Sequence, residues 1–139
     1  MVHNGSMKIS TKGRYALRVM IDIAQHGHHD QTVAVKDIAD RQGISKKYLE
    51  QIMTLLSKAD LITTTRGNVG GYKLTRQPDT YSVGEILRAT EGDLTPLACL
   101  NDDSYCPRQE NCPTQAFWQG LHQTITTYVD RQTLADLLR

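Results

Sequence analysis

The chain has 139 residues, of which 39% are hydrophobic and 22% charged, and its formal net charge is +1. This size and composition predict one globular domain of ordinary size. The densest apolar stretch, residues 15–24, is interrupted by Arg18 and Asp22. It therefore excludes a transmembrane helix, which needs roughly 18 or more apolar residues. Residues 1–6 lack the apolar core of a signal peptide, and we interpret them as a cloning remnant ahead of a native start at Met7.

Charge is divided unevenly along the chain. Residues 7–76 contain twelve Lys and Arg against six Asp and Glu, a net charge of +6, whereas residues 77–139 contain four against nine, a net charge of −5. A basic half of this kind favours contact with a polyanion such as nucleic acid. A solvated charged surface is the alternative explanation.

Three helices are predicted in the basic half. Apolar residues recur at steps of three and four over residues 11–25, which predicts a helix with one buried face. A short second helix is predicted over residues 35–41, and Gly43 follows where a left-handed residue lets one helix stop and another begin. Ser45 suits the N-cap of a third helix over residues 46–59. The exposed start of this helix carries Lys46, Lys47, Glu50 and Gln51.

A β-hairpin is predicted directly after the third helix. Two short β-branched runs, residues 61–65 and 72–75, flank residues 66–71, whose three glycines permit the positive φ angles of a hairpin tip. The order helix, short helix, glycine-containing turn, helix and hairpin predicts a mainly α fold with a small β-hairpin, the winged helix-turn-helix. In this fold the third helix enters the major groove, and the hairpin lies along the flanking backbone or minor groove.

The acidic half predicts further helices. Ser82 and Glu85 match an S-x-x-E capping box that starts a fourth helix reaching about Glu91. Pro113, at a first helical position, opens a long helix with an apolar stripe, and a last short helix is predicted over residues 134–138. A two-fold interface would cover the stripe, and packing inside its own chain is the alternative. The stripe consists of Phe117, Leu121, Ile125 and Tyr128.

Several residues of the predicted third helix and hairpin are candidates for DNA contact. Lys46 and Lys47 suit phosphate or guanine, Tyr48 suits phosphate or a thymine methyl group, and Gln51 suits adenine or a water-mediated base contact. Arg66 stands at the base of a tip whose neighbours are glycines, so its guanidinium can reach a narrow minor groove. Solvated surface charges or a surface ion pair are the alternatives for the basic residues.

The three cysteines, Cys99, Cys106 and Cys112, lie within residues 93–113, which show no periodicity. We expect this loop to separate a DNA-binding region at 7–92 from a dimerisation helix and C-terminal helix at 114–139. An odd number of cysteines without a signal peptide favours the reducing cytoplasm. The C-x6-C-x5-C spacing differs from the C-x2-C pairs of most structural zinc sites, so zinc is second choice to an iron-sulphur cluster. Three reduced thiols without a metal are the remaining alternative.

Three ordered segments resemble those of the Rrf2 family of bacterial transcription regulators: residues 7–17 (MKISTKGRYAL), 44–51 (ISKKYLEQ) and 66–72 (RGNVGGY). The resemblance spans about residues 7–138. It implies a homodimeric winged-helix protein that binds palindromic double-stranded DNA and pairs through the long C-terminal helix. A small enzyme or electron carrier that uses a cluster is a weak further alternative, because the sequence shows no nucleophile-base pair, phosphate loop or histidine-carboxylate set. On this resemblance Gln51 and Arg66 occupy positions of base and minor-groove contact, and Glu50 one that tunes promoter choice. The matching segments also assign Ser45, Gly67, Gly70, Gly71 and Tyr72 to the DNA-binding surface.

The resemblance also implies a cluster, because cluster-binding members carry three cysteines in this loop. Some of them add a histidine three residues after the last cysteine, where this chain has Gln115, and others a carboxylate from the partner's first helix, where it has Arg14. We therefore expect a 2Fe-2S or 4Fe-4S cluster held by three cysteines, with an open or exogenously filled fourth site. His122 is a possible substitute ligand. Members without a cluster imply the alternative, a repressor controlled by a thiol or a partner protein.

Overall fold

The computed structural model describes residues 9–27, 31–64, 71–92, 94–95 and 112–138. In these ranges the chain is mostly helical, with one two-stranded antiparallel hairpin, which confirms the predicted fold class. The elements in chain order are α1 (Thr11–His26), α2 (Val35–Gln42), α3 (Lys46–Lys58), β1 (Ile62–Thr64), β2 (Tyr72–Leu74), the 3-10 turn η1 (Pro78–Thr80), α4 (Val83–Glu91), α5 (Gln115–Arg131) and α6 (Leu134–Leu137).

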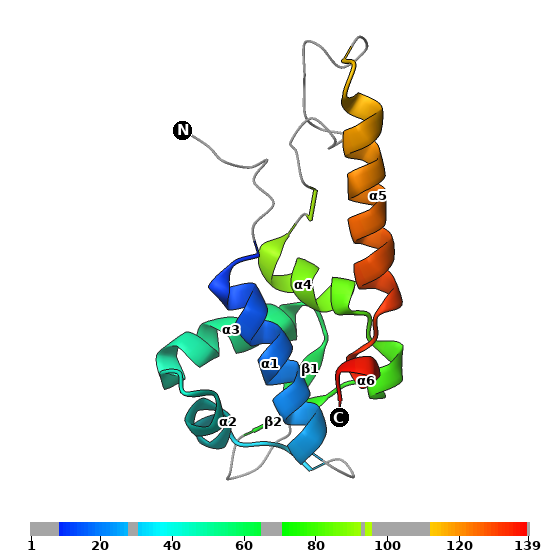
Figure 1. Cartoon of the computed structure of the whole chain (residues 1–139). Coiled ribbons are helices and arrows are strands. Elements are labelled where there is room, and N and C mark those ends of the chain that lie inside the picture. Colours follow the sequence, from blue (N-terminus) through cyan, green and yellow to red (C-terminus); the bar gives the residue numbers. More distant parts are fainter. Residues whose placement is uncertain (1–8, 28–30, 65–70, 93, 96–111, 139) are drawn as a thin grey trace.

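The helices α1 to α4 and the hairpin form a body from which α5 projects (Figure 1). Helix α1 runs through the middle of this body, and its buried face carries Ala16, Val19, Met20 and Ile23. Helix α3 contributes Leu49, Ile52, Met53 and Leu56 to the same core. Leu134 of α6 is fully buried there as well, so the chain returns to the body after α5.

Polar side chains define where the helices begin. Ser10 caps α1 by accepting a hydrogen bond from the backbone N–H of Gly13 at 3.1 Å. The predicted capping box of α4 is present, because Ser82 accepts from the N–H of Glu85 and the Glu85 carboxylate accepts from the N–H of Ser82, each at 3.0 Å. Such an N-cap contributes about 1 kcal/mol to stability. The starts of α1 and α4 are therefore encoded locally, whereas α2 and α5 begin without a side-chain cap hydrogen bond.

The predicted ends of several elements need correction. The prediction that Pro113 is the first residue of the long helix is wrong: α5 begins at Gln115, and Pro113 lies in the turn before it. Helices α1 and α2 each extend one residue beyond the predicted end, whereas α3 and α6 stop one residue earlier. Both strands are shorter than predicted, and Thr65 lies outside the described residues. Helix ends fray, so shifts of one or two residues are expected of such boundaries.

In the described ranges no helix is both long enough and apolar enough to cross a membrane.

Candidate nucleic-acid interface and cysteine segment

The first two turns of α3 present a polar face to solvent. Ser45 caps the helix by accepting a hydrogen bond from the N–H of Tyr48 at 3.0 Å. Leu49 and Ile52 anchor the opposite face in the core. Ser45 itself is exposed, and so are the candidate contact residues Lys46, Lys47, Glu50 and Gln51. Sequence reasoning overlooked Thr54, which is exposed one turn further along and which helical spacing could have revealed.

The turn before α3 has the expected left-handed geometry. Gly43 has φ +67°, and the following N–H, that of Ile44, donates to the carbonyl of Ala39 at 3.2 Å. A left-handed residue lets α2 end and α3 begin within three residues, and glycine adopts this conformation without a steric penalty. The angle between the two helices therefore depends on this position.

The hairpin of β1 and β2 is the wing of this fold, and its base is held by a third segment of the chain. Strands β1 and β2 pair with Thr64 opposite Tyr72, and Tyr72 also exchanges backbone hydrogen bonds of 2.8 and 2.9 Å with Val33. Gly71 is buried so closely against Thr32 and Val33 that a Cβ atom would meet them at 2.9 Å. This contact accounts for glycine at that position. The other candidate wing residues, Arg66, Gly67 and Gly70, lie outside the described residues.

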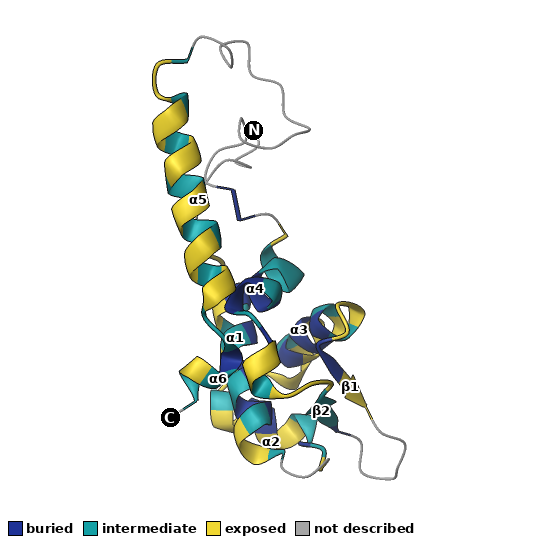
Figure 2. Cartoon of the chain, turned by 90° about the vertical axis from the view of Figure 1, so that its right-hand side faces the viewer, coloured by how far each residue is buried: buried dark blue, intermediate teal, exposed yellow. Residues whose placement is uncertain are grey.

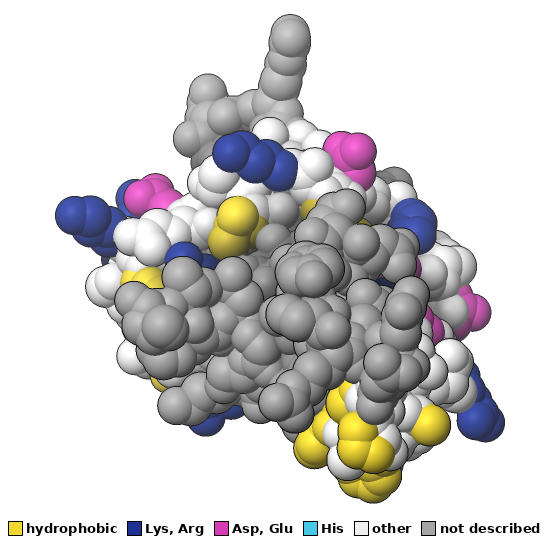
Figure 3. All heavy atoms as spheres, turned by 90° about the horizontal axis from the view of Figure 1, so that it is seen from above, with side chains coloured by type: hydrophobic (Ala, Val, Ile, Leu, Met, Phe, Trp, Pro, Cys, Tyr) yellow, Lys and Arg dark blue, Asp and Glu magenta, His cyan; other side chains and the backbone are white. Residues whose placement is uncertain are grey.

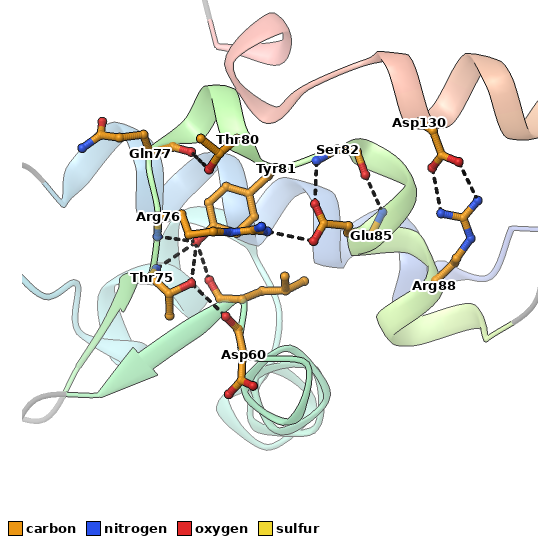
Figure 4. A network of polar contacts seen from close by, with 11 residues as sticks. Asp60, Thr75, Arg76, Gln77, Thr80, Tyr81, Ser82, Glu85, Arg88 and Asp130 are labelled. Atoms are coloured by element: carbon orange, nitrogen blue, oxygen red, sulfur yellow. Dashed lines mark hydrogen bonds and ion pairs between the residues drawn. The ribbon is translucent and has the colours of Figure 1, made fainter.

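Tyr81 joins the wing to the rest of the body. Its buried hydroxyl donates to the carbonyl of Leu61 at 2.7 Å and accepts from the N–H groups of Thr75 and Arg76 at 2.8 and 3.1 Å. Figure 4 shows these bonds meeting at one oxygen, with the guanidinium of Arg76 4.3 Å from the centre of the Tyr81 ring. Both ends of the hairpin are thus tied to one side chain, which sequence analysis did not single out.

An ion pair joins Arg76 to the start of α4. The Nη2 atom of Arg76 lies 2.8 Å from the Oε1 atom of Glu85. Burial by itself would raise the pKa of Glu85, but the hydrogen bond from the Ser82 N–H and the neighbouring Arg76 outweigh it and hold this pKa below its ordinary value. The hydrogen bond between the side chains of Arg76 and Glu85 also raises the pKa of Arg76. Glu85 therefore carries its negative charge in the folded protein down to a lower pH.

A buried carboxylate connects α1 to α2. Asp22 is only 2% exposed, and its two oxygens accept hydrogen bonds from Arg41 at 3.1 and 2.8 Å. The amide nitrogen of Gln42 donates to the same carboxylate at 2.9 Å. Buried charges require partners of this kind, because an unpaired carboxylate is costly to desolvate. Sequence analysis had noted Asp22 only as an interruption of an apolar stretch, since burial of a charge has no sequence pattern.

Of the three cysteines, Cys112 is described, and Cys99 and Cys106 lie outside the described residues. The sulphur atom of Cys112 lies 3.3 Å from the hydroxyl oxygen of Thr114, the residue that precedes α5. Gln115 is the first residue of α5 and His122 lies seven residues along it. At 1.5 Å per residue, His122 lies about 10 Å further along the helix axis than Gln115.

Helix α5 leaves much of its apolar stripe in water. No residue of this helix is buried in the single chain, and Phe117 and Tyr128 are each 65% exposed. Leu121 and Ile125 are half-buried. Figure 2 shows solvent-exposed positions along the whole helix, and in Figure 3, which looks down on its N-terminal end, hydrophobic side chains gather at the lower right.

Comparison with known proteins identifies the family. The sequence profile of Rrf2, described as an iron-dependent transcriptional regulator, matches residues 9–139. The chain belongs to the Rrf2 family. It is 41% identical over 133 residues to protein rrf2 of Nitratidesulfovibrio vulgaris, with 96% of this chain and 88% of that protein covered.

Two solved structures of Rrf2-family regulators have the same fold. CymR, the global cysteine regulator of Bacillus subtilis, has a TM-score of 0.75 at 34% identity, with 94% of this chain and 95% of that chain covered. IscR of T. potens has a TM-score of 0.73 at 39% identity, with 94% and 85% covered. This protein is therefore an Rrf2-family transcriptional regulator and not an enzyme, and its relatives are DNA-binding proteins.

Proposed function

We propose that this Rrf2-family regulator is a homodimer that reads the two halves of a palindromic operator with α3 and the wing. The observation that carries this proposal is the capped and solvent-exposed start of α3, where Lys46, Lys47 and Gln51 lie beside one another. The lysines contact phosphate, and Gln51 reads a base edge in the major groove. Glu50 discriminates between sites, because a carboxylate accepts a hydrogen bond from cytosine and repels phosphate.

Substitution of Gln51 tests this use of α3. We expect Gln51→Ala to weaken binding to a duplex selected from a random library by about tenfold or more, because a good base contact contributes about 1–3 kcal/mol of discrimination. Gln25, which is exposed near the end of α1, offers a matched control in Gln25→Ala. Fluorescence anisotropy measures both affinities. Equal affinities for Gln51→Ala and wild type would remove the base-reading role of Gln51.

The dimer in this proposal forms through α5. Two exposed aromatic side chains and the half-buried Leu121 and Ile125 lie along one stripe of a helix that projects from the body. A second copy of the same helix covers such a stripe with an identical one, which is the simplest closed arrangement. The two α3 helices then face adjacent major grooves of the operator.

We further propose that Cys99, Cys106 and Cys112 hold a 2Fe-2S or 4Fe-4S cluster that controls operator affinity. The three thiols suit iron, whereas the amide of Gln115 and the guanidinium of Arg14 are poor ligands. His122 lies about 10 Å beyond Gln115 along α5, and we propose that it leaves the fourth site open. When bound, the cluster supplies sensitivity to oxygen, nitric oxide or iron shortage, since its fourth site is open to exogenous ligands.

The chain on both sides of the cysteine segment contacts the DNA-binding body. Glu91, the last residue of α4, accepts hydrogen bonds from the N–H and the hydroxyl of Ser10, both at 2.8 Å, and so holds the start of α1. At the other end, Asp130 of α5 pairs with Arg88 of α4, with bonds of 2.7 and 3.1 Å. A structural change between residues 92 and 112 would be transmitted to the start of α1 through Glu91. It would be transmitted to the proposed dimer interface through α5, which follows directly. Such coupling is reciprocal, so DNA that binds the cluster-bound form more tightly also raises the affinity of the protein for its cluster.

The visible absorption spectrum of protein purified without oxygen, with iron and sulphide counted per chain, tests the cluster. The proposal expects brown protein with matching iron and sulphide. The second candidate is a regulator controlled by a thiol or a partner protein, and the 34% identity to the cysteine regulator CymR favours it, together with Gln115. Colourless, iron-free protein that binds the selected duplex would establish this second candidate instead.

A further inference from the structure

We infer that the DNA-contact surface continues from α3 onto α1, where Arg18 binds a phosphate group of the DNA backbone beside the first turn of α3. This inference rests on the proposed function, because it assigns a further contact to the same interface. It concerns a residue outside the recognition helix and outside the wing.

Arg18 lies against the end of α2 and close to the start of α3. Its Nε–H donates to the amide oxygen of Gln42 at 2.9 Å, and its Cζ atom lies 4.9 Å from the centre of the Tyr15 ring. The Tyr15 ring in turn packs edge-on against Tyr48, with 6.0 Å between ring centres. Tyr48 belongs to the first turn of α3, so Arg18 flanks the part of α3 that enters the groove.

The guanidinium of Arg18 is held in place before DNA arrives. Gln42 uses its amide nitrogen for the buried carboxylate of Asp22 and its amide oxygen for Arg18, so the position of Gln42 is fixed from both sides. The bond to Gln42 involves only the Nε–H of Arg18. Because the guanidinium is planar, this bond also orients its two terminal nitrogens. Guanidinium groups bind phosphate oxygens through such a pair of parallel N–H donors. Preorganisation lowers the entropy cost of such a contact.

The charge of α1 supports a polyanionic partner at this position. Arg14 and Arg18 are exposed four residues apart, which places them one above the other on the same side of the helix. Asp22 is the only acidic residue of the α1 sequence, and it is buried and paired with Arg41. The exposed side of α1 therefore offers positive charge without an exposed acid on the same helix.

The salt dependence of DNA binding tests this inference with the full-length chain. Each phosphate contact contributes about 0.9 to the slope of log affinity against log salt concentration, so Arg18→Ala should lower the slope of a dimer by about 2. The affinity loss should be the same for the selected duplex and for a scrambled one, because a phosphate contact carries no sequence information. Arg18→Lys keeps the charge and should keep most of the slope.

Arg131→Ala is the matched control, because it removes the same charge from an exposed position at the end of α5. Arg18 is exposed, and thermal melting followed by circular dichroism checks that Arg18→Ala remains folded. An unchanged slope for Arg18→Ala, or an equal fall for Arg131→Ala, overturns the inference while DNA binding by the wild type stands. Absence of DNA binding by the wild type overturns the proposed function itself.

Discussion

The hydroxyl of Tyr81 is a single group that joins the chain before β1 to the chain after β2. Removing it in Tyr81→Phe leaves the N–H groups of Thr75 and Arg76 and the carbonyl of Leu61 without their partner in a buried place. We expect the free energy of unfolding to fall by about 2–3 kcal/mol, because unsatisfied buried polar groups cost about 1–3 kcal/mol. Urea unfolding measures this loss. A loss of less than about 0.5 kcal/mol would contradict the anchoring role.

The ion pair of Glu85 predicts a pH dependence with a definite sign. The pKa of Glu85 is lower in the folded protein than its ordinary value, so its contribution to stability is complete above the ordinary pKa and is lost as the pH falls through the lowered one. The difference in Tm between wild type and Glu85→Gln should therefore be largest near neutral pH and shrink below about pH 4. Both partners are partly exposed, and the difference will be small. A difference that grows on acidification would contradict the assignment.

At the scale of elements, Asp22 sets how α2 packs on α1. Asp22→Asn keeps the shape of the side chain but removes the charge that Arg41 and Gln42 share, and we expect the free energy of unfolding to fall by about 2–3 kcal/mol. Chemical denaturation measures the change. Asp40 is an exposed aspartate on α2, and Asp40→Asn should change stability by less than about 0.5 kcal/mol. If both substitutions lower the free energy of unfolding by the same amount, the buried network of Asp22 does not stabilise the packing of α2 on α1.

The sequence predicted the elements well where local chemistry defines them. Ser45, Gly43 and the Ser82–Glu85 capping box each act on their own neighbours, so their roles follow from residue type and spacing. Pro113 was misplaced because proline suits a turn as well as the first helical position, and it lies here in the turn before α5, whose N-cap residue Thr114 makes no side-chain cap hydrogen bond. Local patterns do not distinguish these two uses.

Contacts between distant segments escaped sequence analysis. The Asp22 network, the Tyr81 hydroxyl and the position of Arg18 each depend on residues that are far apart in the chain, so no periodicity reveals them. The exposed start of α3 was predicted as found, since amphipathic spacing separates Leu49 and Ile52 from Lys46 and Lys47. The DNA contacts, the dimer interface and the cluster ligands stay predictions.

At the scale of the whole molecule, the account predicts that α5 holds a dimer together. Phe117 is 65% exposed in the single chain, so Phe117→Glu should leave the fold intact and place charge in the proposed interface. We expect light scattering to give twice the 15.6 kDa chain mass for the wild type and a clear shift toward the chain mass for Phe117→Glu. Gln119 is exposed about 180° around the helix from the centre of the stripe, and Gln119→Glu should stay dimeric. Dimers in both variants would place the interface elsewhere.

We propose that the three cysteines control DNA affinity through the chain on either side of them, where Glu91 contacts the start of α1 and Asp130 of α5 contacts α4. The most direct measurement is the Kd for the selected duplex, determined without oxygen for the iron-loaded wild type and for the variant with Cys99, Cys106 and Cys112 all replaced by alanine. We expect affinities that differ by tenfold or more, about 1.4 kcal/mol. Equal affinities would contradict it, and the regulator would then receive its signal elsewhere.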